Sequence, residues 1–140
     1  MKLLHTSDWH IGRSLFEFSL LDDQRAFFEQ LCQIIEEQKI DALLISGDLY
    51  DRSMPSAQAV SLLDEMFTTL IRRYHLPILA ISGNHDSAQR ISYFSALVRS
   101  AGIYVTEAFE GRMQSVTLSD EYGELTVWML PLARAFHKTA

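Results

Sequence analysis

Three short polar clusters in this sequence contain the side chains that could do chemistry. The clusters are SDWH at 7–10, SGDLYD at 46–51 and SGNHD at 82–86, and their metal-ligating or acid–base side chains are Asp8, His10, Asp48, Asp51, Asn84, His85 and Asp86. Carboxylate and amide oxygens suit hard divalent cations, whereas imidazole suits Zn²⁺, Fe and Mn²⁺. The mixture predicts a divalent metal site, with Mn²⁺ as the best match and Mg²⁺, Zn²⁺ or Fe as substitutes.

The spacing within these clusters indicates how the groups would share ions. Asp8 and His10 are two residues apart, so at the end of an extended strand they would project from one side and bind one ion together. Asp48 could bridge two ions through its two oxygens, and Asn84 offers a neutral amide oxygen. Two ions about 3.5 to 4 Å apart would activate a water and stabilise both reacting oxygens of a phosphoester displacement. The predicted chemistry is phosphate-ester hydrolysis.

The elements that must position these clusters alternate between strands and helices. Apolar runs predict strands at 2–6, 41–46, 76–82 and 103–105. Apolar residues at helical spacing predict helices at 22–38, 56–74 and 90–100, the second of them capped by Ser56. Two extended stretches at 113–118 and 124–130 predict a hairpin. The predicted class is α/β, with a mostly parallel sheet, flanking helices and a late antiparallel hairpin.

Each polar cluster follows one of the predicted strands. The carboxyl ends of parallel strands meet at one edge of a sheet, where ligands bind, so we expect the three clusters to lie together. Gly47 and Gly83 directly precede Asp48 and Asn84. A glycine there allows a tight turn or a close approach of backbone to metal or phosphate, although a glycine after a strand is also an ordinary turn residue.

The composition limits the classes of protein to consider. With 140 residues, 48% of them hydrophobic, the chain can form one soluble domain. Its 12 basic and 18 acidic residues do not indicate a nucleic-acid or anionic-membrane partner. The sequence has no signal peptide or membrane span, which predicts a cytoplasmic location without membrane contact. The single Cys32 excludes an intramolecular disulfide and is expected to be buried.

The three clusters resemble a known set of motifs. The D-x-H of 8–10, the G-D-x-x-D of 47–51 and the G-N-H-D of 83–86, in this order, are similar to the first three motifs of the calcineurin-like metallophosphoesterase superfamily. HTSDWHIG, SGDLYDRSMPS and SGNHDS further resemble the bacterial SbcD nuclease subunits. The resemblance covers essentially the whole chain and implies half of a four-layer α/β/β/α sandwich.

The resemblance also implies a role for each matching residue. By this resemblance Asp8 and His10 would hold the first metal, Asp48 would bridge, and Asn84 would hold the second. His85 would be catalytic, because it would lie beside the scissile phosphate and protonate the leaving oxygen. Two further residues would act on these ligands without binding the metal. Asp86 would orient His85 or its loop, and Asp51 could hold a metal-binding side chain in place. The role of Asp51 stays open, because relatives often carry a histidine near its position.

The activity implied by the resemblance is that of a Mn²⁺-dependent DNA nuclease. SbcD-like proteins trim and nick DNA ends and hairpins in DNA repair, recombination and replication, as dimers bound to the coiled-coil ATPase SbcC. One alternative is another enzyme on the same scaffold, such as a small phosphodiesterase or a phosphatase. A second alternative is an inactive half-domain with an incomplete metal site.

The sequence departs from the family pattern in one respect. The later motifs that supply further histidines, G-H and G-H-x-H, do not occur, and His137 is the one histidine after His85. We therefore expect residues 1–140 to be the N-terminal part of a single nuclease domain that is incomplete at its C-terminus. Two other residues near the clusters have simpler expected roles. His5 is expected as a packed or hydrogen-bonded core side chain that could also support a ligand from behind, and Trp9 as a cover for the core.

Overall fold

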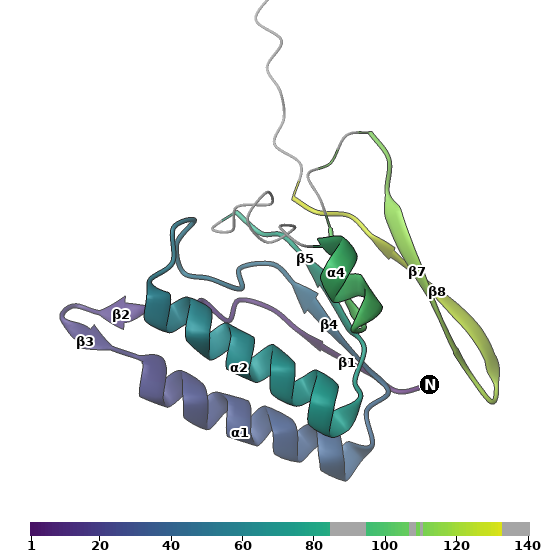
Figure 1. Cartoon of the computed structure of the whole chain (residues 1–140), viewed down its shortest axis with the longest axis horizontal. Coiled ribbons are helices and arrows are strands. Elements are labelled where there is room, and N and C mark those ends of the chain that lie inside the picture. The colour runs from purple at the N-terminus through teal and green to yellow at the C-terminus, as the bar shows by residue number, and fades with distance from the viewer. Residues whose placement is uncertain (85–94, 107–108, 110, 133–140) are drawn as a thin grey trace, which may run out of the picture.

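The centre of the computed structural model is a parallel sheet. The structure describes residues 1–84, 95–106, 109 and 111–132, and for 95–97 it describes the backbone alone. The sheet has the order β1-β4-β5-β6, and each neighbouring pair is parallel (Figure 1). Its strands are β1 (Leu3–Thr6), β4 (Ala42–Ser46), β5 (Ile78–Ile81) and β6 (Ile103–Val105). The prediction of a mostly parallel sheet is confirmed.

Two long helices, α1 (Leu21–Gln38) and α2 (Ala57–Tyr74), lie side by side over one face of this sheet (Figure 1). Ser56 caps α2 as predicted, because its side chain accepts a hydrogen bond from the Ala59 backbone N–H at 3.2 Å. A short helix, α4 (Ser95–Ser100), is the described part of the helix predicted at 90–100. No helix in the described part of the chain combines the length and apolar character needed to cross a membrane.

The main core lies between the helices and the sheet. Leu43, Ile45 and Ile78 of the strands are at most 1% exposed. They belong to one cluster with buried side chains from both long helices, namely Leu31, Ile35, Leu62, Met66 and Leu70. Cys32, expected to be buried, is half-buried at the edge of this cluster.

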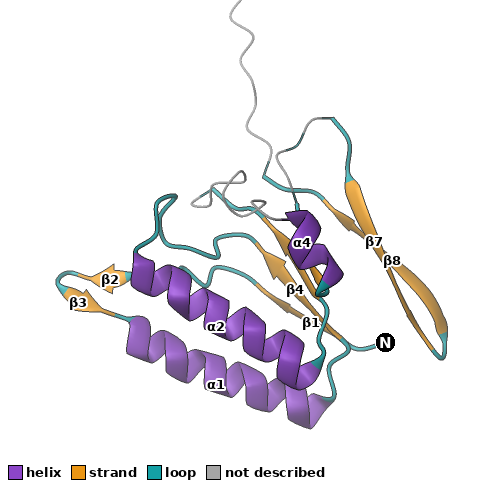
Figure 2. Cartoon of the chain, in the orientation of Figure 1, coloured by secondary structure: helices purple, strands orange, loops and turns teal. Residues whose placement is uncertain are grey.

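A long hairpin, β7 (Gln114–Asp120) and β8 (Gly123–Met129), covers part of the opposite face (Figure 2). Val116 and Met129 pack with Leu79 of β5 in a second, smaller cluster. The α/β class with a late antiparallel hairpin is therefore confirmed. A second hairpin, β2 (Ser14–Leu15) with β3 (Phe18–Ser19), was not predicted, because strands of two residues are too short to show an alternating pattern.

Candidate metal centre

The first two polar clusters are joined by a continuation of the β1–β4 pairing beyond the ends of those strands. The backbone bonds of this continuation join residues 8–11 to residues 47–51, in parallel, and Ile11 and Tyr50 form a parallel bridge. The bonds run from Asp8 N to Gly47 O (3.1 Å), His10 N to Asp48 O (2.9 Å), Ile11 N to Leu49 O (2.9 Å) and Asp51 N to Ile11 O (3.2 Å). The sheet therefore determines how the two clusters lie relative to each other.

Apolar residues between the polar ones anchor the first loop to the core. Trp9 is 6% exposed and Ile11 is 1% exposed. The Trp9 ring packs edge-on against Phe27 and Phe67, with centroids 5.8 and 6.2 Å away. Its indole Nε1–H donates to Thr6 Oγ1 at 3.0 Å. The expectation that Trp9 covers the core is confirmed, and its burial leaves the neighbouring polar side chains outside the core.

One side chain that holds this loop was missed by the motif analysis. Gln24 of α1 makes three hydrogen bonds to the loop: its Oε1 accepts from Gly12 N at 3.0 Å, and its Nε2 donates to the carbonyls of Trp9 at 3.2 Å and His10 at 2.8 Å. The signal in the sequence was a polar residue at the inward-facing position between Leu21 and Phe28.

Three residues of the two loops form a compact group of possible ligands. One ligand atom from each of Asp8, His10 and Asp48 lies within 4.8 Å of the others. His10 Nε2 is 3.7 Å from Asp8 Oδ1 and 3.8 Å from Asp48 Oδ2. Asp48 is buried, Asp8 is exposed, and the Ser7 hydroxyl donates to the Asp8 carboxylate. Two carboxylates and an imidazole at this spacing fit a divalent cation of the Mn²⁺ or Zn²⁺ kind.

The backbone of these three residues differs from the extended strand end assumed from the sequence. β1 ends at Thr6, and Asp8, His10 and Asp48 have φ values of 57°, 45° and 52°. This left-handed conformation is uncommon for residues other than glycine and concentrates at functional sites. The assumption of strand alternation was therefore wrong, because left-handed turns, and not an extended chain, bring Asp8 and His10 together.

The third polar cluster adjoins the second through its glycine. A Cβ atom on Gly47, which has φ +83°, would lie 2.8 Å from the Cα of Gly83. A Cβ on Gly83 would overlap the side chain and backbone N of Asp48. The permissive backbone angle expected for a tight turn is observed at Gly47, and both glycines allow a close approach between the second and third clusters. Asn84 follows Gly83 directly and is exposed, and His85 and Asp86 lie outside the described residues.

The remaining two sequence candidates lie in different places. Asp51 lies beside His10, with its Oδ1 3.4 Å from His10 Nδ1. His5 does not join the group: it is exposed, its Nε2 lies 2.7 Å from Ser46 Oγ, and it lines a pocket of about 340 Å³ beneath the β7–β8 hairpin. The expected hydrogen bond of His5 is confirmed, but the expected core position is wrong, because the side chain lies in this pocket and stays exposed.

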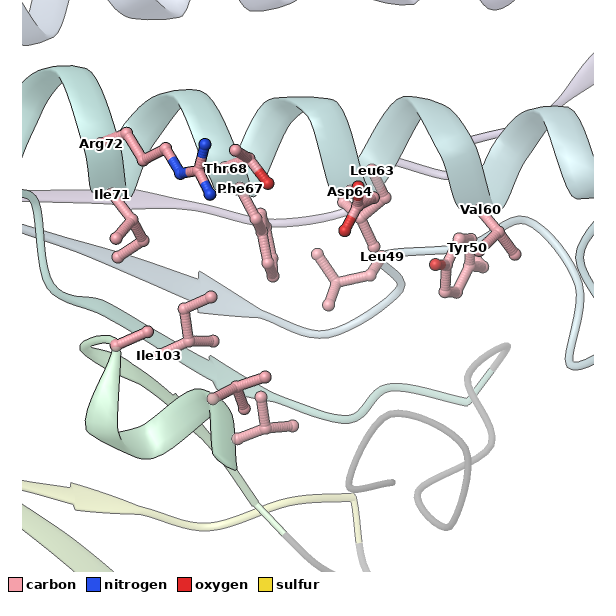
Figure 3. A pocket seen from close by; sticks show the side chains of 13 residues that line it. Leu49, Tyr50, Val60, Leu63, Asp64, Phe67, Thr68, Ile71, Arg72 and Ile103 are labelled. Carbon is pink, nitrogen blue, oxygen red and sulfur yellow. The ribbon is translucent and has the colours of Figure 1, made fainter. Parts of the chain in front are cut away.

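A separate apolar pocket of about 470 Å³ lies between α2 and β6 (Figure 3). Val60, Phe67 and Ile71 of α2 and Ile103 of β6 point into it. Asp8, His10 and Asp48 do not line this pocket, so the possible metal ligands and the apolar pocket are different features of the described surface.

Comparison with known proteins gives two kinds of match. The family model described as calcineurin-like phosphoesterase matches residues 1–132. The chain is similar to a protein of Staphylococcus epidermidis named as the SbcD subunit of the nuclease SbcCD, at 39% identity over 119 residues, which are 85% of this chain and 32% of that protein. It is also similar to the protein of the same name from Staphylococcus saprophyticus, at 33% identity over 133 residues, which are 95% of this chain and 34% of that protein. The chain thus spans about a third of the length of these relatives.

Proposed function

The chain belongs to the calcineurin-like phosphoesterase family, and from this premise we propose that the protein is a metal-dependent DNA nuclease subunit of the SbcD kind. It would hydrolyse phosphodiester bonds at DNA ends and hairpins, in repair and recombination in the cytoplasm. The observation that carries the proposal is the group of Asp8, His10 and Asp48 at the carboxyl edge of the sheet. Its position matches the edge where ligands bind in α/β folds.

In this proposal two divalent ions, preferably Mn²⁺, bind at that edge. Asp8 and His10 would hold the first ion, Asp48 would be a ligand of both, and Asn84 would offer its amide oxygen to the second. When bound, such ions supply a nucleophile at neutral pH and neutralise charge on the phosphate. Outside the described residues, His85 is proposed to protonate the leaving oxygen and Asp86 to orient His85.

Exposed side chains that follow the two ligand-bearing loops in the sequence support a nucleic acid as the substrate. Arg13 and Arg52 are exposed directly after the two ligand loops, despite the net negative charge of the chain. The β2–β3 hairpin, which follows Arg13, exposes Phe16 by 93% and Phe18 by 77%. Cations that pair with phosphates and aromatic rings that stack on bases are the two features that proteins use to bind unpaired strands.

This arrangement gives a test that separates a DNA nuclease from a small phosphodiesterase. The double substitution Phe16→Ala with Phe18→Ala is made in the full-length protein. Because each stacked base contributes about 1 to 3 kcal/mol, cleavage of a DNA end with an unpaired strand should fall by about tenfold or more. Hydrolysis of bis(p-nitrophenyl) phosphate should stay unchanged. An equal loss on both substrates, or no loss on either, would favour the small-phosphodiesterase or phosphatase alternative.

The second alternative, an inactive half-domain, is tested by counting ions. In titration calorimetry the wild-type 140-residue chain should bind Mn²⁺, and the same chain with Asp48→Ala should not. Full-length protein with Asp48→Ala should in parallel lose Mn²⁺-dependent cleavage. Binding by the full-length protein but not by the 140-residue chain would mean that residues 1–140 are a metal-incomplete part of the nuclease domain.

The proposed partners follow from the relatives named as a subunit of SbcCD. We propose a complex with an SbcC-like coiled-coil ATPase and a homodimer that pairs through α2. The support for the dimer is the apolar pocket of Figure 3, at whose rim Val60 is 44% exposed. Val60→Glu should convert the dimer to monomers in analytical ultracentrifugation, whereas Ser61→Glu, at the next and also exposed position, should not. If both variants form dimers, the dimer does not pair through this surface of α2.

A further inference from the structure

The backbone of Ser82, the first residue of the third polar cluster, is held on both sides by segments that lie far away in the sequence. Its N–H donates to Thr106 Oγ1 at 3.4 Å, and its carbonyl accepts from Leu132 N at 3.2 Å. Thr106 directly follows β6, and Leu132 comes three residues after the end of β8. The ends of two other strands therefore hold the point at which the third cluster leaves β5.

The Thr106 hydroxyl extends the pairing of β5 with β6. The Thr106 N–H donates to the Ala80 carbonyl at 3.1 Å. In a regular parallel ladder the next bond would run from Ser82 N to the Thr106 carbonyl, because the bonds between parallel strands are evenly spaced. In this structure the Ser82 N–H donates to the Thr106 side chain, so it keeps a partner at a point where both strands have ended.

Burial makes this bond hard to replace. Thr106 is 0% exposed and Ser82 is 4% exposed. Water does not rescue a buried N–H that loses its acceptor, so the backbone either keeps an unpaired donor or moves. The next residue leaves little room for movement, since a Cβ on Gly83 would overlap the Asp48 carboxylate and lie 2.5 Å from Asp48 N. A shift of Ser82 would therefore be passed to Gly83 and change the surroundings of Asp48.

We propose that Thr106 is a positioning residue for the possible metal site. Its hydroxyl holds the Ser82 N–H, and Ser82 thereby keeps Gly83 against the carboxylate of Asp48. The inference rests on the proposed function and adds to it a residue that lies outside all three motifs. In this role Thr106 acts through the backbone and is not itself a ligand.

Two substitutions separate the hydroxyl of Thr106 from its methyl group. Thr106→Val keeps nearly the same shape but removes the acceptor, whereas Thr106→Ser keeps the acceptor and removes the methyl. If Thr106 only filled space, serine would be the more damaging variant, since removing a buried methyl leaves a cavity. The positioning role predicts the opposite order. Thr117→Val is the matched control, because it removes a hydroxyl that pairs with Thr126 Oγ1 at 2.9 Å in the exposed part of the β7–β8 hairpin.

The first test needs no metal and is therefore separate from the proposed function. Amide hydrogen exchange, followed by NMR on the metal-free chain, compares Ser82 with Leu43, a buried residue of β4. Relative to Leu43, Ser82 should exchange about fivefold faster or more with Thr106→Val, because a buried donor has lost its acceptor. Ser82 should exchange as in the wild type with Thr106→Ser and with Thr117→Val. An unchanged ratio with Thr106→Val would overturn the proposal.

The second test measures the Mn²⁺ affinity of the full-length protein by calorimetry. Thr106→Val should weaken binding by about two- to tenfold, the equivalent of one hydrogen bond, and Thr106→Ser and Thr117→Val should leave it unchanged. Wild-type affinity with Thr106→Val, or a larger loss with Thr106→Ser, would refute the positioning role. If the wild type binds no Mn²⁺, the proposed function fails, and the exchange of Ser82 alone decides whether Thr106 holds the third cluster.

Discussion

Gln24 of α1 forms hydrogen bonds to the loop that carries Asp8 and His10, and its removal should have a measurable cost. Gln24→Ala deletes three hydrogen bonds, to Gly12 N and to the carbonyls of Trp9 and His10. All three are partly buried, so the loop groups lose partners that water replaces incompletely. The expected result is a destabilised domain in which the His10 loop keeps its Trp9 contact with α1 but loses its hydrogen bonds to that helix.

The magnitude follows from the number of bonds. Each contributes about 0.5 to 1.5 kcal/mol, and alanine returns a few tenths of a kcal/mol through its higher helix propensity. The free energy of unfolding should therefore fall by about 1 to 4 kcal/mol. For a domain of this size, about 2.5 kcal/mol lowers the melting temperature by roughly 10 °C.

The assay is thermal and urea unfolding followed by circular dichroism, with Gln33→Ala as the matched control. Gln33 is a glutamine of the same helix, but it is exposed and donates to Glu37 one turn away at 2.8 Å. Such a pair contributes about 0.2 to 0.5 kcal/mol, so the control should barely change the melting temperature. If Gln24→Ala and Gln33→Ala unfold at the same temperature, the three bonds do not hold the loop as described.

Three further outcomes are expected. Gly83→Ala should cost about 1 to 3 kcal/mol in urea unfolding and weaken Mn²⁺ binding, because the new Cβ overlaps Asp48; unchanged stability and affinity would contradict this contact. Pairing with Asp120 raises the pKa of the Met1 ammonium from 8.0, and the same pairing lowers the pKa of Asp120 from 3.8. Asp120→Asn should therefore lower the melting temperature most between about pH 4 and 8, where both groups are charged. A difference in melting temperature between wild type and variant that stays constant from about pH 3 to 10 would refute the pairing. Burial raises the pKa of the Cys32 thiol, so the thiol should react with Ellman's reagent at about pH 8 more slowly in the folded chain than in urea. Equal rates would contradict its half-buried position.

The elements with strong apolar patterns were predictable from the sequence. The helix expected at 22–38 is observed as Leu21–Gln38, and the strand expected at 103–105 is observed as Ile103–Val105. Both predictions succeed because a buried face of a helix or strand requires apolar residues at regular spacing, and this spacing is visible in the sequence. The strand expected at 76–82 is shorter, as Ile78–Ile81, because strand ends are set by pairing partners and not by composition.

Three of the predicted metal ligands, Asp8, His10 and Asp48, lie together in the described part of the chain, but their geometry was not predictable. The three clusters were placed at one edge by the rule for parallel strands, and the contact of Gly83 with Asp48 agrees with that placement. The left-handed backbone of Asp8 and His10 could not be predicted from their residue types, because it is imposed by contacts that form only in the folded chain. Gln24 lies outside every motif, so its bonds to the loop became evident only from the packing of α1.

The strained conformation of the ligand loops can persist because apolar side chains alternate with the polar ones. Trp9 and Ile11 are buried on either side of His10, and Leu49 is 1% exposed directly after Asp48. Each left-handed residue costs of order 1 to 3 kcal/mol, whereas burying one large apolar side chain stabilises the fold by about 1.5 to 3 kcal/mol. The main core therefore offsets the strain at His10 and Asp48 from within residues 1–84. In the proposed metal site, this part would therefore keep its shape without ligands from later motifs, and those ligands would add affinity to a half-site that is already formed.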